Sequence, residues 1–230
     1  MDQRVAIVTS VRRQSADVVT IYFTLDDGSI LEYEAGQYIT VFFENTSHPE
    51  GKAYSLSSRP SARRMSITVK RVGEYSARLH TLAPSDHFMI SSAYGFFGPR
   101  TTASLTCLAG GVGIAPIWSV IKHTLELDAD RPIQLWYSNA RADSVAFRRA
   151  ISERNRVHRE FAVHHHITRQ QCVMSDETHG RIDLDRCVEV ACEAEQYLVC
   201  GSVTFVRDMW RGLLARGVSE RAISTEVFFE

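Results

Sequence analysis

The stretch Cys107-Leu108-Ala109-Gly110-Gly111-Val112-Gly113-Ile114-Ala115-Pro116-Ile117 decides how this chain is organised. An apolar, strand-like run over 105–109 ends in closely spaced glycines, and a helical pattern follows over 116–127. Glycines at a strand-to-helix turn allow a tight bend and let the backbone approach a ligand. The N–H groups and positive dipole at the helix start favour an anion such as a pyrophosphate. A tight turn without a ligand would show the same pattern, so both interpretations stay open.

A second segment, Lys52-Ala53-Tyr54-Ser55-Leu56-Ser57-Ser58, lies upstream between two strand-like runs at 37–43 and 65–70. Successive side chains of an extended segment point to opposite faces, so Lys52 and Tyr54 share a face that Ser55 does not. One interpretation is an amphipathic strand with an exposed tyrosine. The other is a flavin-binding strand, where the ring packs on a flat heterocycle, the lysine meets a phosphate and the serine hydrogen-bonds a ring nitrogen.

The pattern of apolar runs changes along the chain and predicts two domains. Up to about residue 100, short β-rich runs separated by turn signals predict an antiparallel β-barrel. The expected strands are 4–8, 18–23, 38–43 and 65–69, with a short helix over 76–83. Beyond residue 103, strands and helices alternate, which predicts an α/β domain with a parallel sheet. Its expected strands are 105–109, 133–138, 161–167 and 197–200, its helices are 116–127, 144–154, 183–193 and 204–216, and an extended tail follows. The predicted domains are 1–100 and 103–230.

Ligands of a parallel sheet bind at the carboxyl ends of its strands. The glycine loop, the segment 138–141 and the pair Cys200-Gly201 each follow an expected strand. We therefore expect all three to line one edge of the second sheet.

Composition fits a globular protein and excludes several classes. The 230 residues are 44% hydrophobic and 23% charged, with a formal net charge of −1. That charge gives no reason to expect a nucleic acid partner, and no apolar run approaches the roughly 20 residues of a membrane helix. The start, Met1-Asp2-Gln3-Arg4, lacks a signal-peptide pattern, so we expect a cytoplasmic protein with no membrane partner.

Cysteines and histidines do not form a metal site in the sequence. The five cysteines are scattered and odd in number, which argues against a disulfide framework. Cys187 and Cys192 have the spacing of a plant-type iron–sulfur cluster, but Glu195 stands where the next cysteine is needed. The triple His164-His165-His166 lies in an expected strand without a matching carboxylate or cysteine. We expect no metal.

Six motifs, in order along nearly the whole chain, resemble those of the ferredoxin–NADP reductase superfamily of flavoprotein reductases. They are Lys52-Ala53-Tyr54-Ser55, Gly73-Glu74-Tyr75-Ser76, Gly95-Phe96-Phe97-Gly98, Gly110-Gly111-Val112-Gly113-Ile114-Ala115-Pro116, Cys200-Gly201-Ser202 and Glu226-Val227-Phe228. Two positions depart from the family pattern. Lys52 replaces an arginine. A lysine keeps the positive charge but cannot form the planar, bidentate hydrogen bonds of a guanidinium to phosphate, so this change predicts weaker FAD binding. Ser202 replaces a proline, which predicts a looser nicotinamide corner.

The resemblance implies an FAD-dependent NAD(P)H oxidoreductase that transfers hydride to FAD. The implied catalytic residues are Ser55, Cys200 and Glu226. The implied cofactor-binding residues are Lys52, Ala53, Tyr54, Ser55, Val69, Lys70, Gly73, Tyr75, Ser76, Gly110, Gly111, Gly113, Ile114, Ala115, Pro116, Ser138, Arg141, Gly201 and Phe228. Arg141 is placed to meet the adenosine ribose or a 2′-phosphate, while Asp143 favours a free ribose hydroxyl, so the choice between NADH and NADPH stays open.

The electron acceptor is the least defined part of the expected function. A chain without its own iron–sulfur domain is expected to pass electrons to a separate protein, such as a ferredoxin, a flavodoxin or an oxygenase component. One alternative is a flavin reductase that uses diffusible flavin, against which Gly73 and Ser76 argue and which Lys52 mildly favours. Another is a non-catalytic binding subunit that keeps the fold.

Overall fold

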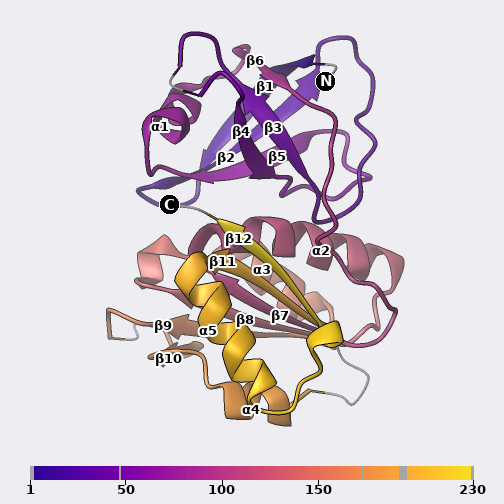
Figure 1. The fold of residues 1–230 in the computed structure, drawn as a ribbon, viewed down its shortest axis with the longest axis vertical. Coiled ribbons are helices and arrows are strands. Elements are labelled where there is room, and N and C mark those ends of the chain that lie inside the picture. The colour runs from indigo at the N-terminus through magenta and orange to yellow at the C-terminus, as the bar shows by residue number, and fades with distance from the viewer. Residues whose placement is uncertain (1–2, 47, 172–173, 192–195, 229–230) are drawn as a thin grey trace.

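A computed structural model describes residues 3–46, 48–171, 174–191 and 196–228 of this chain. Figure 1 shows two sheets that follow one another along the chain and lie one above the other, with helix α2 (Ile114–Leu127) between them. The last strand, β12 (Ile223–Phe228), runs towards the junction, so its end lies close to the upper sheet.

The first sheet is antiparallel throughout. Its order is β4-β3-β6-β1-β2-β5. The strands are β1 (Arg4–Arg13), β2 (Val18–Leu25), β3 (Tyr38–Phe42), β4 (Lys52–Ser55), β5 (Met65–Lys70) and β6 (His87–Ile90). A bridge between Leu56 and Ile67 joins the end of β4 to β5, which brings the two edge strands of the sheet together. The predicted antiparallel barrel is confirmed.

The second sheet is parallel throughout, with the order β10-β9-β8-β7-β11-β12. Its strands are β7 (Leu105–Gly110), β8 (Ile133–Asn139), β9 (Phe161–Ile167), β10 (Glu177–His179), β11 (Gln196–Ser202) and β12. The helices that cover it are α2, α3 (Arg148–Val157), α4 (Leu184–Glu189) and α5 (Val203–Leu214). The predicted α/β class with a parallel sheet is confirmed.

Several boundaries differ from the sequence-based expectation. Strands β6 and β10 were not predicted, and α1 (Glu74–Thr81) begins two residues earlier than expected. Helix α3 begins at Arg148 rather than at residue 144, because Phe147 adopts a left-handed φ of 59° that a helix cannot continue through. Residues 142–144 form a separate 3-10 turn instead. The end of the helix expected over 183–193 lies partly outside the described residues.

Helix α2 holds the two sheets together. Ten of its side chains are buried. Ser119 donates a hydrogen bond to the Ser58 carbonyl, and Lys122 Nζ donates to the Ser57 carbonyl at 2.6 Å. Glu126 forms an ion pair with Arg59 at 2.9 Å. The junction is thus fixed by contacts between α2 and the segment that follows β4.

Among the helices of the described residues, none has the length and apolar character needed to cross a membrane.

Candidate functional site

A hydrogen bond between the two sheets marks the candidate site. Ser55, the last residue of β4, donates from Oγ to Glu226 Oε1 of β12 at 2.6 Å. Ser55 is buried and Glu226 is half-buried. These residues are 171 positions apart in the chain. Only the docking of the two sheets through α2 brings them together.

Cys200 lies beside this pair. It is the register partner of Glu226 on one side and of Ala109 on the other. The glycine loop packs against the same point, since a Cβ placed on Gly113 would lie 2.2 Å from the Cys200 carbonyl oxygen. Only glycine fits there without a backbone shift. Three residues predicted to be catalytic, Ser55, Cys200 and Glu226, therefore meet next to the predicted dinucleotide loop.

The protonation states of these groups are set by burial. Burial raises the pKa of Glu226 to about 7, and the hydrogen bond from Ser55 opposes that rise. Burial also raises the pKa of the Cys200 thiol, and the nearby Glu226 carboxylate adds to this effect. Cys200 is thus held as a neutral thiol, while Glu226 can gain or lose a proton near neutral pH.

The cofactor-binding residues predicted on β4 become more buried along the strand. Lys52 and Ala53 are exposed, Tyr54 is half-buried and Ser55 is buried. Tyr54 packs against the core of the first sheet, and burial raises the pKa of its phenol. Val69 and Lys70 are the last two residues of β5. Val69 is buried and Lys70 is half-buried.

The predicted motif at 73–76 opens helix α1. Ser76 Oγ accepts hydrogen bonds from the backbone N–H groups of Val72 and Gly73, at 2.9 and 3.0 Å, and so caps the helix. Tyr75 is buried, and its hydroxyl donates to the Val41 carbonyl at 2.8 Å. The side chains of Tyr75 and Ser76 are therefore engaged within the fold, which leaves the backbone at Gly73–Ser76 as the part that can face a ligand.

Gly73 has no steric reason to be glycine. Its φ of −162° is extended backbone that any residue adopts, and an added Cβ would meet no atom within 4 Å. Gly111 is similarly open, with no atom within 4 Å of an added Cβ, although its φ of +53° favours glycine. A backbone that is bare and open at the start of two helices suits the close approach of a phosphate.

The remaining residues predicted in the glycine loop support the turn from within. Ile114, Ala115 and Pro116 are buried in the first turn of α2. Pro116 is tolerated there because the first N–H groups of a helix have no partner within the helix. Gly110 and Gly201 both lie against the ring of Phe205, so the two predicted nicotinamide-side segments share one wall.

Phe228 is the last described residue of β12 and is the register partner of Ser202. It is half-buried and packs against the core cluster around α2. Ser202 caps α5 by accepting a hydrogen bond from Phe205 N at 3.4 Å. The serine that replaces the family proline thus has a structural role at this helix start.

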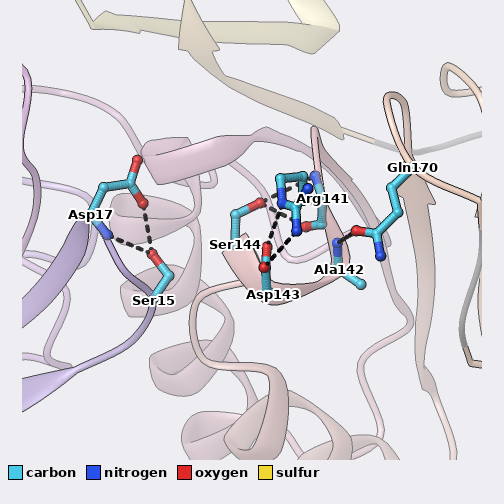
Figure 2. Close-up of polar contacts among 7 residues, drawn as sticks. All are labelled: Ser15, Asp17, Arg141, Ala142, Asp143, Ser144 and Gln170. Carbon is cyan, nitrogen blue, oxygen red and sulfur yellow. Dashed lines mark hydrogen bonds and ion pairs between the residues drawn. The ribbon is translucent and has the colours of Figure 1, made fainter.

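Arg141 is paired with a neighbouring carboxylate. Figure 2 shows its guanidinium against Asp143, with two hydrogen bonds of 3.0 Å, and its backbone N–H against Ser144 Oγ at 3.3 Å. Asp143 raises the pKa of Arg141, and the side chain is exposed. The sequence offered Arg141 and Asp143 as opposite indications of the coenzyme, and in this arrangement they form an ion pair with each other.

A basic cavity that no sequence motif predicted lies at the carboxyl ends of the strands. This cavity, of about 600 Å³, is lined by Ser138, by Thr168 and Arg169 after β9, and by Phe205 in the first turn of α5. Arg181 and Arg207 also line it, with Asp208 as the carboxylate that lies near both. The signal was present, because Thr168 and Arg169 directly follow an expected strand, as the segment 138–141 does.

The histidine triple is part of the second sheet. The His164 ring stacks on Trp136 with centroids 4.0 Å apart and lies 2.9 Å from Gln134 Oε1. Burial lowers the pKa of His164 and of His165 to about 4. Within the described part of the chain, no group of three metal-ligating side chains could hold an ion. Cys172 and Cys192 lie outside the described residues.

An antiparallel barrel, followed by a parallel sheet whose glycine loop faces the barrel, is typical of flavoprotein oxidoreductases that bind two dinucleotides, FAD and NAD(P)H. The comparisons with known proteins agree. Residues 5–98 match the oxidoreductase FAD-binding domain, and residues 107–210 match the oxidoreductase NAD-binding domain. The chain belongs to the ferredoxin–NADP reductase superfamily, and it is an FAD-dependent NAD(P)H oxidoreductase.

Known relatives and structures extend this comparison. A flavohemoprotein of Rhizobium meliloti is 26% identical over 94% of this chain, which spans 58% of that relative. The FAD/NAD-binding domain of a Vibrio cholerae nitric oxide dioxygenase has a TM-score of 0.87 and 25% identity, with 99% of both chains covered. A Neisseria gonorrhoeae ferredoxin NADP⁺ reductase with bound FAD and NADP shares the fold, with a TM-score of 0.83 and 20% identity over the full length of both chains.

Proposed function

We propose that this protein transfers hydride from NAD(P)H to bound FAD and passes the electrons to a separate redox protein. The observation that carries the proposal is the 2.6 Å hydrogen bond from Ser55 to Glu226, with Cys200 beside it. It joins the predicted flavin strand to the predicted nicotinamide corner at one point. FAD, when bound, supplies an acceptor that takes two electrons as hydride and can release them singly.

The residues present fit FAD. The bare, open backbone at Gly73 and the start of α1 would face the pyrophosphate, and Lys52 would add a positive charge. Tyr54 would pack on the flavin ring, and the backbone of Val69 and Lys70 would complete the wall. The proposed FAD domain is 1–100, and the proposed NAD(P) domain is 103–230.

Each of the three residues at the reaction centre, Ser55, Glu226 and Cys200, would have a separate role. Ser55 would orient the flavin through its hydroxyl, and Glu226 would hold that hydroxyl and carry a proton, since its pKa of about 7 suits both directions of transfer. Neutral Cys200 would help to position the nicotinamide against the flavin. Phe228 would cover the site against water until the coenzyme enters.

The basic cavity would take the adenosine end of the coenzyme. Gly110, Gly111 and Gly113 would meet the pyrophosphate, and Ser138 would line the path between the loop and the cavity. Three arginines face this cavity, and one carboxylate, Asp208, lies near two of them. A surplus of guanidinium groups favours a dianionic 2′-phosphate, so we propose NADPH as the preferred donor. Arg141 would then lie outside the main contact.

The acceptor would be a ferredoxin, a flavodoxin or an oxygenase component. The chain spans 58% of the length of its Rhizobium meliloti flavohemoprotein relative. Two alternatives stay testable, namely a reductase of diffusible flavin and a non-catalytic binding subunit.

The first test is an absorbance spectrum of the purified, FAD-supplemented and desalted protein, before and after anaerobic NADPH and, separately, NADH. We expect flavin bands near one equivalent per chain that bleach faster with NADPH. Ferredoxin, flavodoxin and cytochrome c then serve as acceptors in turnover. A colourless protein that reduces added FAD would favour the diffusible-flavin alternative, and a protein that neither binds nor reduces flavin would overturn both enzymatic functions.

A further inference from the structure

A second cavity lies between the two sheets, apart from the proposed cofactor site. Its volume is about 390 Å³, within the range of roughly 300–1,000 Å³ that is typical of small-molecule pockets. Arg12 and Tyr22 line it from the first sheet, Trp118 and Lys122 from α2, and Phe147 and Arg154 from the region of α3. None of the residues proposed to hold FAD or NAD(P)H lines this cavity.

Among the described residues, the cations of this cavity form no ion pair with a carboxylate, although the pKa of Glu153 is lowered by its hydrogen bond with Arg149 and, to a smaller extent, by the charge of Arg12. Lys122 Nζ donates to the Ser57 carbonyl at 2.6 Å, and Arg154 Nη1 lies 3.4 Å from His158 Nε2. Within the described residues, no ion pair joins Arg12, Lys122 or Arg154 to a carboxylate. Glu153, which also lines the cavity, is paired with Arg149 at 2.7 Å. The cavity therefore carries a surplus of positive charge.

Lys122 is the most constrained of these cations. Its ammonium group lies 5.7 Å from the centre of the Trp118 ring. Burial, together with repulsion from Arg59 and Arg154, lowers the pKa of Lys122 to about 7. A half-buried ammonium group that has only a neutral carbonyl as its acceptor would be stabilised by an anion in the cavity.

The walls of the cavity are aromatic. The rings of Trp118 and Phe147 are 6.0 Å apart and nearly parallel, at 28°, and Tyr22 lines the first-sheet side. Val157 adds an exposed apolar rim. Flat rings prefer offset-stacked or edge-on contact with other flat rings, so these walls favour a planar apolar body over a bare ion.

We propose that this cavity binds an aromatic carboxylate, with its ring among Tyr22, Trp118 and Phe147 and its carboxylate on Lys122 and Arg154. The ligand would touch the first sheet, α2 and α3 together. It would therefore bind the docked arrangement of the two sheets and raise the thermal midpoint of unfolding.

The test is isothermal titration of the FAD-loaded full chain with 2-naphthoate, repeated with acetate and with 2-naphthalenemethanol. We expect naphthoate to bind at least tenfold more tightly than either analogue, because only naphthoate supplies both ring and charge. Lys122→Met should weaken naphthoate binding about tenfold and Arg154→Gln several-fold. Arg156→Gln, the matched control on the same helix but outside the cavity lining, should leave binding unchanged.

Circular dichroism of each variant establishes that it is folded. Arg154→Gln is the safer of the two changes, because Lys122 also donates a hydrogen bond to the Ser57 carbonyl across the junction of the sheets. A naphthoate affinity that stays the same in Lys122→Met and Arg154→Gln would overturn the proposal, as would no binding to the wild-type chain at millimolar naphthoate. Equal binding of acetate would reduce the site to a simple anion site and overturn the aromatic assignment.

Discussion

The two halves of the candidate site are built in different ways. On the first sheet, Lys52, Tyr54 and Ser55 follow one another on a single strand, β4. On the second sheet, the contributing residues come from the ends of separate strands, as Gly113, Cys200 and Glu226 do. The first half depends on residues that are adjacent in sequence on one strand, whereas the second depends on how parallel strands align and on one close backbone contact. Changes in the second half should therefore have larger effects.

The two sheets also differ in how they bury polar groups. In the first, Thr20, Ser57 and Thr68 form part of a hydroxyl network with contacts of 2.9 to 3.0 Å. In the second, His165 and His166 are buried, and their Nδ1 atoms have no hydrogen-bond partner in the described part of the chain. Hydroxyls do not titrate, while buried imidazoles do, so the second sheet should be the acid-sensitive one.

The largest effect is expected from Gly113→Ala, which breaks the contact that assembles the second half. Its Cβ would lie 2.2 Å from the Cys200 carbonyl oxygen, so the backbone must move. We expect the free energy of unfolding to fall by about 3 kcal/mol, measured by urea denaturation. Gly111→Ala is the control, since its Cβ meets no atom and only the left-handed φ costs about 1 kcal/mol. Equal losses in both variants would contradict the close-contact explanation.

The next effect is expected from Glu226→Gln, which tests the contact between the two halves. Glutamine preserves the shape but cannot exchange a proton, so anaerobic flavin reduction should slow about 100-fold in stopped-flow traces. Stability provides a second readout. Because the folded pKa of about 7 exceeds the unfolded value of 4.5, wild-type stability should fall as pH rises through that interval. The variant should lack this fall; an unchanged rate would remove Glu226 from the mechanism.

A smaller effect, confined to acid, is expected from the histidines of the second sheet. The folded pKa of His165 is about 4 and its unfolded value is 6.5, so protonation of the unfolded chain removes stability as pH falls between these values. By pH 5 this loss should reach about 1–2 kcal/mol. Urea denaturation of His165→Gln at pH 7.5 and 5.0 should show a smaller difference than the wild type. His87→Gln, an exposed histidine of the first sheet, should keep the wild-type difference.

The smallest effect separates two arginines within the second half. Arg169 lines the basic cavity, while Arg141 is held by Asp143 outside its lining. Arg169→Ala should raise KM for NADPH about tenfold and leave KM for NADH nearly unchanged, because it removes a charged contact to the 2′-phosphate. Arg141→Ala should change neither constant by more than about twofold. The reverse result would restore Arg141 as the coenzyme contact.

The sequence by itself determined the features that depend on neighbouring residues. Short β-rich runs at 38–43 and 65–69 predicted strands of the first sheet, and the switch to strand–helix alternation after residue 103 predicted the parallel sheet. The glycine loop and the motif at Lys52–Ser55 pointed to the family because their spacing is local and fixed. These signals come from side-chain periodicity and backbone freedom, which each segment carries regardless of what packs on it.

Only the tertiary structure decided which distant groups meet. The contact of Ser55 with Glu226, 171 positions apart, depends on the docking of the two sheets, which no local pattern encodes. Helix α3 begins late because Phe147 turns left-handed, and β6 joins the first sheet through pairing with β1 and β3. The raised pKa of Glu226 likewise arises from burial at the junction. Desolvation and close packing are properties of the assembled chain, so they appear only when the two sheets come together.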